Sequence, residues 1–183
     1  MSETKVHIRD ADSAKKDVQF ILDAFDAVLP HLNTIGSASQ WGSTPLSKNA
    51  AHVDAVHKNV EEAVAYRRTG EGKLVETLVA EVDVGEESFG HVEKGERVPV
   101  AAVTVKERWW PWYITEHKLL APKIEGEKNW VYVHILISDY RAGKWRKGGG
   151  AALMEEVKER AKMRGFERLW VDCWAGNGRK LVG

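Results

Sequence analysis

The sequence predicts a mixed α/β domain built on one central sheet. The chain has 183 residues, which is enough for one sizeable core and short for two. Segments of alternating or continuous apolar residues, typical of strands, occur near the start, in the middle and near the end of the chain. Long segments with apolar residues spaced by three and four lie between them and predict helices. We therefore treat residues 1–183 as a single domain with the element order β-α-α-β-β-β-α-β.

The first part of the chain predicts one strand and two helices. Residues 5–9 alternate between polar and apolar side chains, as a short strand does. The apolar spacing over 16–32 predicts a helix, which Pro30 and Gly36 are expected to close. A second helix is expected over 48–68, with Ser47 as its N-terminal cap.

The rest of the chain predicts four strands and one helix. Strands are expected at 74–84 and 98–105, where β-favouring residues gather. The segment 129–138 is apolar almost throughout, which indicates a central strand buried on both faces. A helix is expected over 148–164, followed by another buried strand over 168–174.

Composition excludes some classes of protein. Lys and Arg number 27, as do Asp and Glu, and this zero net charge argues against a dedicated nucleic-acid binder. No apolar run approaches the roughly 20 residues of a membrane span, and the N-terminus carries no secretory signal pattern. The single cysteine, Cys173, suits a reducing compartment and is expected to be an inert buried thiol. A cytoplasmic location follows as an expectation.

A glycine-rich turn stands between the strand at 129–138 and the helix at 148–164. Its glycines, Gly148, Gly149 and Gly150, follow a basic segment that contains Arg141, Lys144, Arg146 and Lys147. The first N–H groups of a helix have no intrahelical partner, and the helix dipole is positive there, so this turn predicts a site for a pyrophosphate.

Two kinds of nucleotide site have to be weighed for this turn. A P-loop requires Gly-Lys followed by Ser or Thr, which is absent. A dinucleotide fingerprint places its glycines directly after the strand, which is not so here, although Asp172 near the end of the next strand keeps that reading open. On its own, the turn predicts an anion site and little more.

The wider pattern resembles the GNAT family of N-acetyltransferases. The resemblance covers the chain from its first strand to its end and is most specific over 133–178, through Ile135-Leu136-Ile137-Ser138, the turn 147–153 and the segment 169–175. It implies a GNAT-like acyl-CoA N-acyltransferase fold, with acetyl-CoA as cofactor. In that family an Arg/Gln-x-x-Gly-x-Gly/Ala turn binds the pyrophosphate through backbone amides, and the preceding strand splays from its neighbour to bind the pantetheine arm. Carried over, the resemblance assigns the pantetheine arm to Leu136, Ile137, Ser138 and Asn177, and the pyrophosphate to Arg146, Lys147, Gly148, Gly149, Gly150, Ala151 and Ala152.

The sequence departs from the family pattern in two places. The Arg/Gln position falls on Trp145, so Arg146 or Lys144 would have to take over its role. Family members continue after the segment 172–175 into another helix and two strands, whereas this sequence ends at Gly183. We therefore expect a domain that is C-terminally incomplete relative to the family, with an unfinished sheet edge that leaves a homodimer open.

The resemblance implies direct transfer of the acetyl group to an amine of a small molecule or peptide. His134, on the strand before the proposed cofactor residues, is the first candidate for the base, because an ordinary imidazole pKa near 6.5 suits the task. Glu107 and Glu116 are alternatives, and no metal site is expected. Aromatic side chains are candidate walls of the acceptor pocket, with core packing as the alternative: Trp41, Trp109, Trp110 and Trp112.

Two other functions remain open at this point. A GNAT-like domain or scaffold that binds CoA without turnover would follow if the acceptor wall and a general acid were missing. Binding of a different nucleotide, NAD or ATP, by the same turn is the third reading.

Overall fold

The computed structural model describes residues 5–83 and 96–179 and contains one five-stranded sheet. The strands follow one another across the sheet in chain order, antiparallel except for the last pair, which is parallel. The principal elements are β1 (Val6–Asp10), α1 (Asp17–Thr34), α2 (Ala50–Thr69), β2 (Val75–Asp83), β3 (Arg97–Glu107), α3 (Trp112–Thr115), α4 (Ala121–Ile124), β4 (Trp130–Ser138), α5 (Gly149–Met163), β5 (Arg168–Trp170) and α6 (Gly176–Arg179). Short 3-10 helices lie at Ser13–Lys15, Ala38–Gln40, Leu46–Lys48 and Tyr140–Arg146. The predicted mixed α/β class and the order of the main elements are confirmed.

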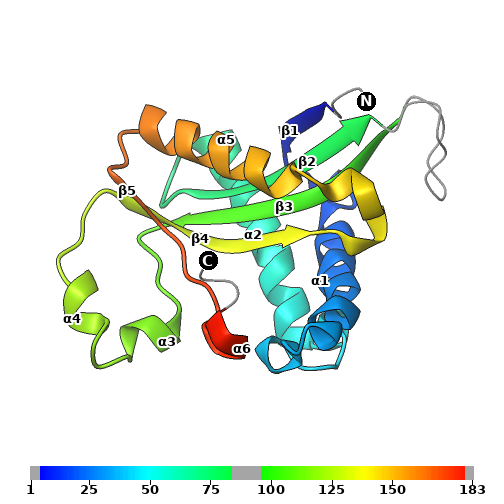
Figure 1. Ribbon diagram of the computed structural model, residues 1–183. Coiled ribbons are helices and arrows are strands. Elements are labelled where there is room, and N and C mark those ends of the chain that lie inside the picture. The colour runs from blue at the N-terminus through cyan, green and yellow to red at the C-terminus, as the bar shows by residue number, and fades with distance from the viewer. Residues whose placement is uncertain (1–4, 84–95, 180–183) are drawn as a thin grey trace.

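The helices cover the sheet on both faces, which creates two hydrophobic cores (Figure 1). Helix α5 lies on one face, where Leu153 and Val157 pack with Val103 of β3. Helices α1 and α2 lie on the other, where Ile21 and Val56 pack with neighbours that include Ala102 and Ile137. Successive residues of a strand point to opposite faces, so Ala102 and Val103 serve different cores. Within 5–83 and 96–179, no helix is long and apolar enough to cross a membrane.

Two helix boundaries differ from the sequence predictions. Helix α1 passes through Pro30 and ends at Thr34, because Leu32 continues the buried apolar stripe beyond the proline. The cap of α2 is Asn49 rather than Ser47, since the Asn49 side chain accepts a hydrogen bond from the backbone N–H of His52. The end of α1 is thus decided by tertiary packing, whereas Asn49 is itself a residue type preferred at helix N-termini.

The last strand is shorter and less buried than predicted. Strand β5 covers only Arg168–Trp170, and its pairing with β4 ends there. Beyond it, Val171 and Cys173 are exposed, so the prediction of a buried strand over 168–174 and a buried thiol is wrong. The chain leaves the sheet after Trp170, and apolar content alone could not reveal that departure.

Candidate functional site

The parallel strands β4 and β5 part from each other after three residues. Trp130, Val131 and Tyr132 pair with Arg168–Trp170, but no described strand pairs with β4 on that side from Val133 to Ser138. Strand β3 remains paired on the opposite side up to Ser138. This edge of β4 therefore leaves main-chain hydrogen-bonding groups available to a ligand.

A β-bulge lies at the start of this open edge. Thr104 of β3 faces Ile135 and Val105 faces Val133, so His134 between them has no partner residue on β3. Bulges bend a strand and re-aim a side chain, and they are frequent beside active sites. The His134 ring lies against Trp109, with ring centroids 4.3 Å apart.

The open edge leads to the N-terminus of α5. Gly148 precedes the helix with φ 85°, a left-handed conformation that glycine adopts without strain. The Ala152 N–H donates to the Gly148 carbonyl at 2.9 Å, so the N–H groups of Gly149, Gly150 and Ala151 come before the first intrahelical bond. These three amides lie at the turn for which the sequence predicts an anion site.

The three glycines of the turn have different surroundings. A Cβ at Gly149 would lie 3.2 Å from side-chain carbons of Val100 and Ala101, so this glycine lets the helix approach the sheet. At Gly150 the nearest neighbour would be the Ser138 hydroxyl at 3.7 Å, which is ordinary contact. The end of β4 and the start of α5 thus lie side by side, as a shared cofactor site requires.

The basic residues before the glycines are only in part available to a ligand. Arg141 forms ion pairs with Asp139 and Asp23 at 2.9 and 2.8 Å, and the Asp139 hydrogen bond raises the pKa of Arg141. The Arg146 guanidinium lies 3.9 Å from the centre of the Tyr140 ring. Lys147 is exposed and next to the anion site.

The residues assigned to the pantetheine arm lie on the open edge but differ in side-chain burial. Ile137 is buried in the core beneath α1, Ser138 is half-buried and Leu136 is 42% exposed. An extended ligand would therefore meet the backbone of this segment rather than three equivalent side chains. The Asn177 side chain lies outside the described residues.

A cavity of about 600 Å³ lies on the α2 side of the sheet, between α2 and the end of β3. His134 and Trp109, both predicted as site residues, line it. Two further lining residues, Lys106 and Asn59, were not singled out in the sequence. Nothing in their local pattern distinguishes them from a surface lysine and a helix-surface asparagine, so only the three-dimensional arrangement reveals them.

Burial changes the acid–base properties of this cavity. Burial, with a smaller contribution from the neighbouring Lys106, lowers the pKa of His134 to about 4. Burial also lowers the pKa of Lys106, whose ammonium lies 5.2 Å from the centre of the Trp109 ring. His134 is therefore neutral at pH 7 and a much weaker base than the ordinary imidazole assumed from the sequence.

The predicted aromatic wall is divided among different environments. Trp109 and Trp110 pack in the same aromatic cluster, where Trp110 stacks on Trp130 at 4.1 Å, but only Trp109 also lines the cavity. Trp112 is 70% exposed, and Trp41 packs on Phe25 at 5.2 Å. Of the four tryptophans, only Trp109 is placed beside His134.

The two alternative bases, Glu107 and Glu116, lie in different surroundings. The Glu107 carboxylate accepts a hydrogen bond from the Leu74 N–H at 3.0 Å and an ion pair from Arg108 at 3.0 Å. Glu116 is exposed and does not line the cavity. Within the described part of the chain, no group of three or more His, Cys, Asp or Glu side chains is placed to hold a metal ion.

Asp172, which the sequence offered for a dinucleotide site, holds the segment after β5 in place. Asp172 accepts hydrogen bonds from the hydroxyls of Tyr132 and Tyr113, the latter at 2.9 Å. Burial and this carboxylate raise the pKa of Tyr132, so its hydroxyl stays protonated. The pair of tyrosines therefore ties the departing chain to α3 and to the sheet.

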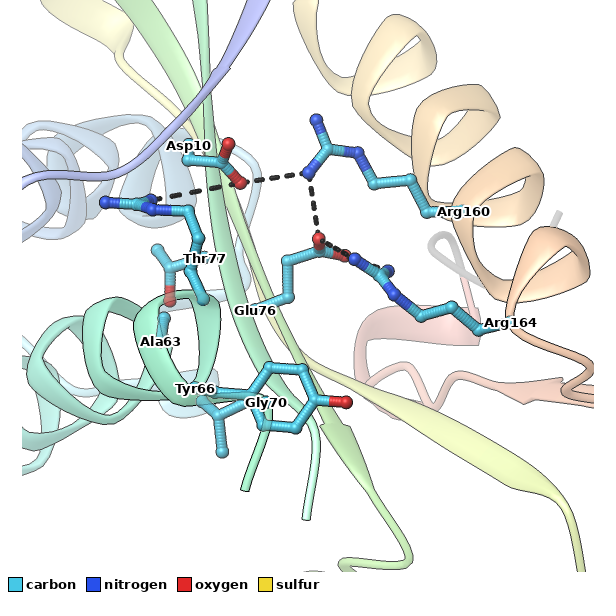
Figure 2. Close-up of a pocket in the computed structure, with 10 residues that line it drawn as sticks. Asp10, Ala63, Tyr66, Gly70, Glu76, Thr77, Arg160 and Arg164 are labelled. Atoms are coloured by element: carbon cyan, nitrogen blue, oxygen red, sulfur yellow. Dashed lines mark hydrogen bonds and ion pairs between the residues drawn. The ribbon is translucent and has the colours of Figure 1, made fainter. Parts of the chain in front are cut away.

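A second cavity, of about 300 Å³, lies at the β1 edge of the sheet, between the C-terminal parts of α2 and α5, and is lined by ion pairs (Figure 2). Arg160 and Arg164 reach from α5 to Glu76, at 2.8 and 2.9 Å. Arg160 also pairs with Asp10 at the end of β1. The charges here are paired with one another and fasten α5 to the sheet.

Comparison with known proteins establishes the fold. No protein-family model and no curated protein matches the sequence. The structure is similar to an N-acetyltransferase from Staphylococcus aureus Mu50, with a TM-score of 0.52 and 16% sequence identity over 97% of this chain and 79% of that one. A putative acetyl transferase from Pyrococcus furiosus aligns with a TM-score of 0.42 and 14% identity over 98% and 92% of the two chains. The chain therefore has the GNAT-like acetyltransferase fold that the sequence pattern predicted.

Proposed function

We propose that the protein is an N-acetyltransferase that moves the acetyl group of acetyl-CoA to an amine of a small molecule or peptide. The observation that carries this proposal is the open edge of β4 from Val133 to Ser138, which ends beside the free amides of α5. The shared fold of the Staphylococcus aureus N-acetyltransferase supports it.

The two parts of this site suit the two parts of the cofactor. The amides of the pantetheine arm can bond to the β4 edge as an added strand would. The diphosphate can accept the N–H groups of Gly149, Gly150 and Ala151, with the exposed Lys147 adding positive charge. The small side chains of Ala151 and Ala152 keep the first helical turn accessible.

The transfer itself requires an amine, a polarised carbonyl and a leaving thiol. The amine nitrogen attacks the thioester carbonyl, a C–N bond forms, the C–S bond breaks, and the proton lost by the amine compensates the one gained by the thiolate. A backbone N–H of the β4 edge near Ile137 can polarise the carbonyl. The neutral His134 ring can accept a hydrogen bond from the amine and direct its lone pair, and proton transfer to this ring is uphill at a pKa of about 4.

Calorimetric titration with acetyl-CoA tests the cofactor site through a matched pair of variants. Gly150→Glu places a carboxylate at the anion site, and we expect the affinity for acetyl-CoA to fall about 100-fold, because a like charge then faces the diphosphate. Gly150 has room for a Cβ and no left-handed conformation, so the fold should persist. Gly150→Ala is the control and should bind nearly as the unchanged protein does.

Two outcomes would reject the cofactor site. One is no binding of acetyl-CoA to the unchanged protein at high micromolar concentration. The other is an unchanged affinity in the Gly150→Glu variant, since the helix terminus would then not hold the diphosphate.

Binding of acetyl-CoA without turnover is the second candidate, and the low pKa of His134 is the observation that favours it. A ring of this kind is a poor base unless a substrate changes its surroundings. Release of CoA thiol in the presence of a panel of amines separates the two candidates. Thiol release that depends on the amine supports transfer, and binding without release supports the non-catalytic role.

A cytoplasmic location belongs to the same proposal. The Cys173 thiol is exposed and free, and a reducing compartment prevents such thiols from pairing between molecules. Fractionation of cells that express the protein tests this location.

A further inference from the structure

The cavity beside His134 contains a buried cation without a matching anion. Lys106 is half-buried and forms no ion pair within the described residues, although it lies on the wall of the cavity. The carboxylate whose charge acts on it, that of Glu62, is engaged with Lys58 at 3.7 Å. A desolvated ammonium that lacks a carboxylate is unfavourable in the free protein.

The same cavity contains a buried hydrogen-bond donor without an acceptor. Asn59 of α2 is 2% exposed and lines the cavity, and its side-chain nitrogen Nδ2 has no hydrogen-bond partner. Buried polar groups are nearly always paired in native proteins, so each exception requires an explanation. Lys106 and Asn59 are both donors, and their common complement is an anionic acceptor.

We infer that this cavity holds the amine substrate and that the substrate carries a carboxylate, bound by Lys106 and Asn59. This inference rests on the proposed acetyltransferase function and names its substrate class as amino carboxylic acids, including free amino acids. A volume of about 600 Å³ is in the range of small-molecule sites. Trp109 forms the apolar wall, and His134 lies where the open edge of β4 begins, on the side from which the amine would reach the thioester.

The charges of the cavity favour an acid over a cationic acceptor such as a diamine. A second ammonium would face Lys106, because the lining carboxylates of Glu62 and Glu107 are already paired with Lys58 and Arg108, whereas a carboxylate would neutralise Lys106. Bound carboxylate would also remove the repulsion that Lys106 exerts on a protonated His134. The other groups acting on this ring are Asp172, which favours its protonation, and His52, which opposes it. A bound acid thus makes His134 a stronger base when the amine must lose its proton.

The chemical balance requires no further reactant. The amine and acetyl-CoA give an amide and CoA thiol, with the carboxylate unchanged. The proton released by the amine passes through His134 or water to the thiolate.

Amino acids and their own primary amides provide a matched test of the carboxylate. Each pair has the same amine carbon skeleton, and only the acid carries the negative charge. With acetyl-CoA held saturating, we expect kcat/KM for the preferred amino acid to exceed that for its amide about tenfold or more, as a charge-assisted contact provides. Equal values for acid and amide in the unchanged protein would overturn the inference.

Substitution of Lys106 tests whether the preference comes from this residue. Lys106→Met should reduce the ratio of acid to amide to nearly one, mainly through a higher KM for the acid. Lys106→Arg should keep most of the preference. Lys123→Met removes the same charge from an exposed position on α4, outside the cavity, and should leave the ratio unchanged.

Separate readouts distinguish failure of this inference from failure of the proposed function. Acetyl-CoA titration and thermal unfolding of Lys106→Met report on the cofactor site and the fold. NMR titration of the His134 ring, assigned by His134→Gln, reports on the cavity without turnover. Adding the amino acid should raise the pKa of His134, and adding its amide should not. If the pKa of His134 stays the same when the amino acid is added, while the protein still binds acetyl-CoA, the substrate class is overturned and the proposed function is not.

Discussion

Two cavities that share part of their lining use charge in opposite ways. In the smaller cavity, Glu76 is bonded to Arg160 and Arg164, and each of these three charges has a partner. In the larger cavity, Lys106 forms no ion pair and the Asn59 side-chain nitrogen has no hydrogen-bond partner among the described residues. Paired charge fastens elements together, and unpaired donors in a cavity indicate a missing ligand.

The largest expected effect on stability comes from removing the anion of the smaller cavity, in which the charges are paired. Glu76→Gln removes the anion that neutralises both arginines, and we expect the free energy of unfolding to fall by about 3 kcal/mol, as when one partner of a buried pair is lost. Urea denaturation measures this change. Glu155→Gln, which removes an exposed partner of Lys158 on α5, is the control and should cost less than about 0.5 kcal/mol. Equal effects of the two variants would show that burial of Glu76 adds nothing.

The next effect is the pH dependence of stability that His134 introduces in the larger cavity. Its folded pKa of about 4 lies below the unfolded value of 6.5, so the unfolded chain binds the proton more readily. Its contribution is therefore present above pH 6.5 and is lost as the pH falls from 6.5 towards 4, by about 2 kcal/mol between pH 7 and pH 5. Burial lowers the pKa of His52 as well, which adds in the same direction. Urea denaturation at both pH values, compared between the unchanged protein and His134→Gln, isolates the His134 contribution. A slope that is the same in both proteins would contradict the low pKa.

The smallest effect has the opposite sign to the first. Lys106→Met removes a desolvated charge that has no ion-pair partner, and we expect the protein to gain up to about 1 kcal/mol of stability. Thermal unfolding measures the gain, and Lys123→Met on exposed α4 should be neutral. A marked loss of stability in Lys106→Met would show that Lys106 stabilises the fold, as the paired charges around Glu76 do.

The sequence predicted the sheet, the main helices and the glycine turn before α5, because these depend on local patterns. Apolar spacing predicted α5, and Gly148 to Gly150 marked its N-terminus. The burial of Lys106 and Asn59 in the cavity could not be predicted, because it depends on how α2 lies against the end of β3. The pKa of His134 was misjudged for the same reason, since desolvation is a property of the assembled fold.

The departure of the chain after β5 likewise depends on tertiary structure. The segment 168–174 is as apolar as a buried strand, yet its pairing with β4 stops at Trp170, and the Asp172 carboxylate accepts hydrogen bonds from the hydroxyls of Tyr113 and Tyr132. These tyrosines are 59 and 40 residues distant in sequence. No local pattern connects residues so far apart.

The bulge at His134 reverses the parity of β4. Before it, the odd-numbered Val131 and Val133 pack in the core beneath α5, and after it the odd-numbered Ile135 and Ile137 pack in the core beneath α1. A single extra residue thus lets one strand supply both cores from positions of the same parity. If His134 were instead paired regularly with β3, a uniform period of two would send Ile135 and Ile137 to the α5 face. The residue at the centre of the proposed chemistry is therefore also the joint at which the two halves of the hydrophobic interior exchange sides.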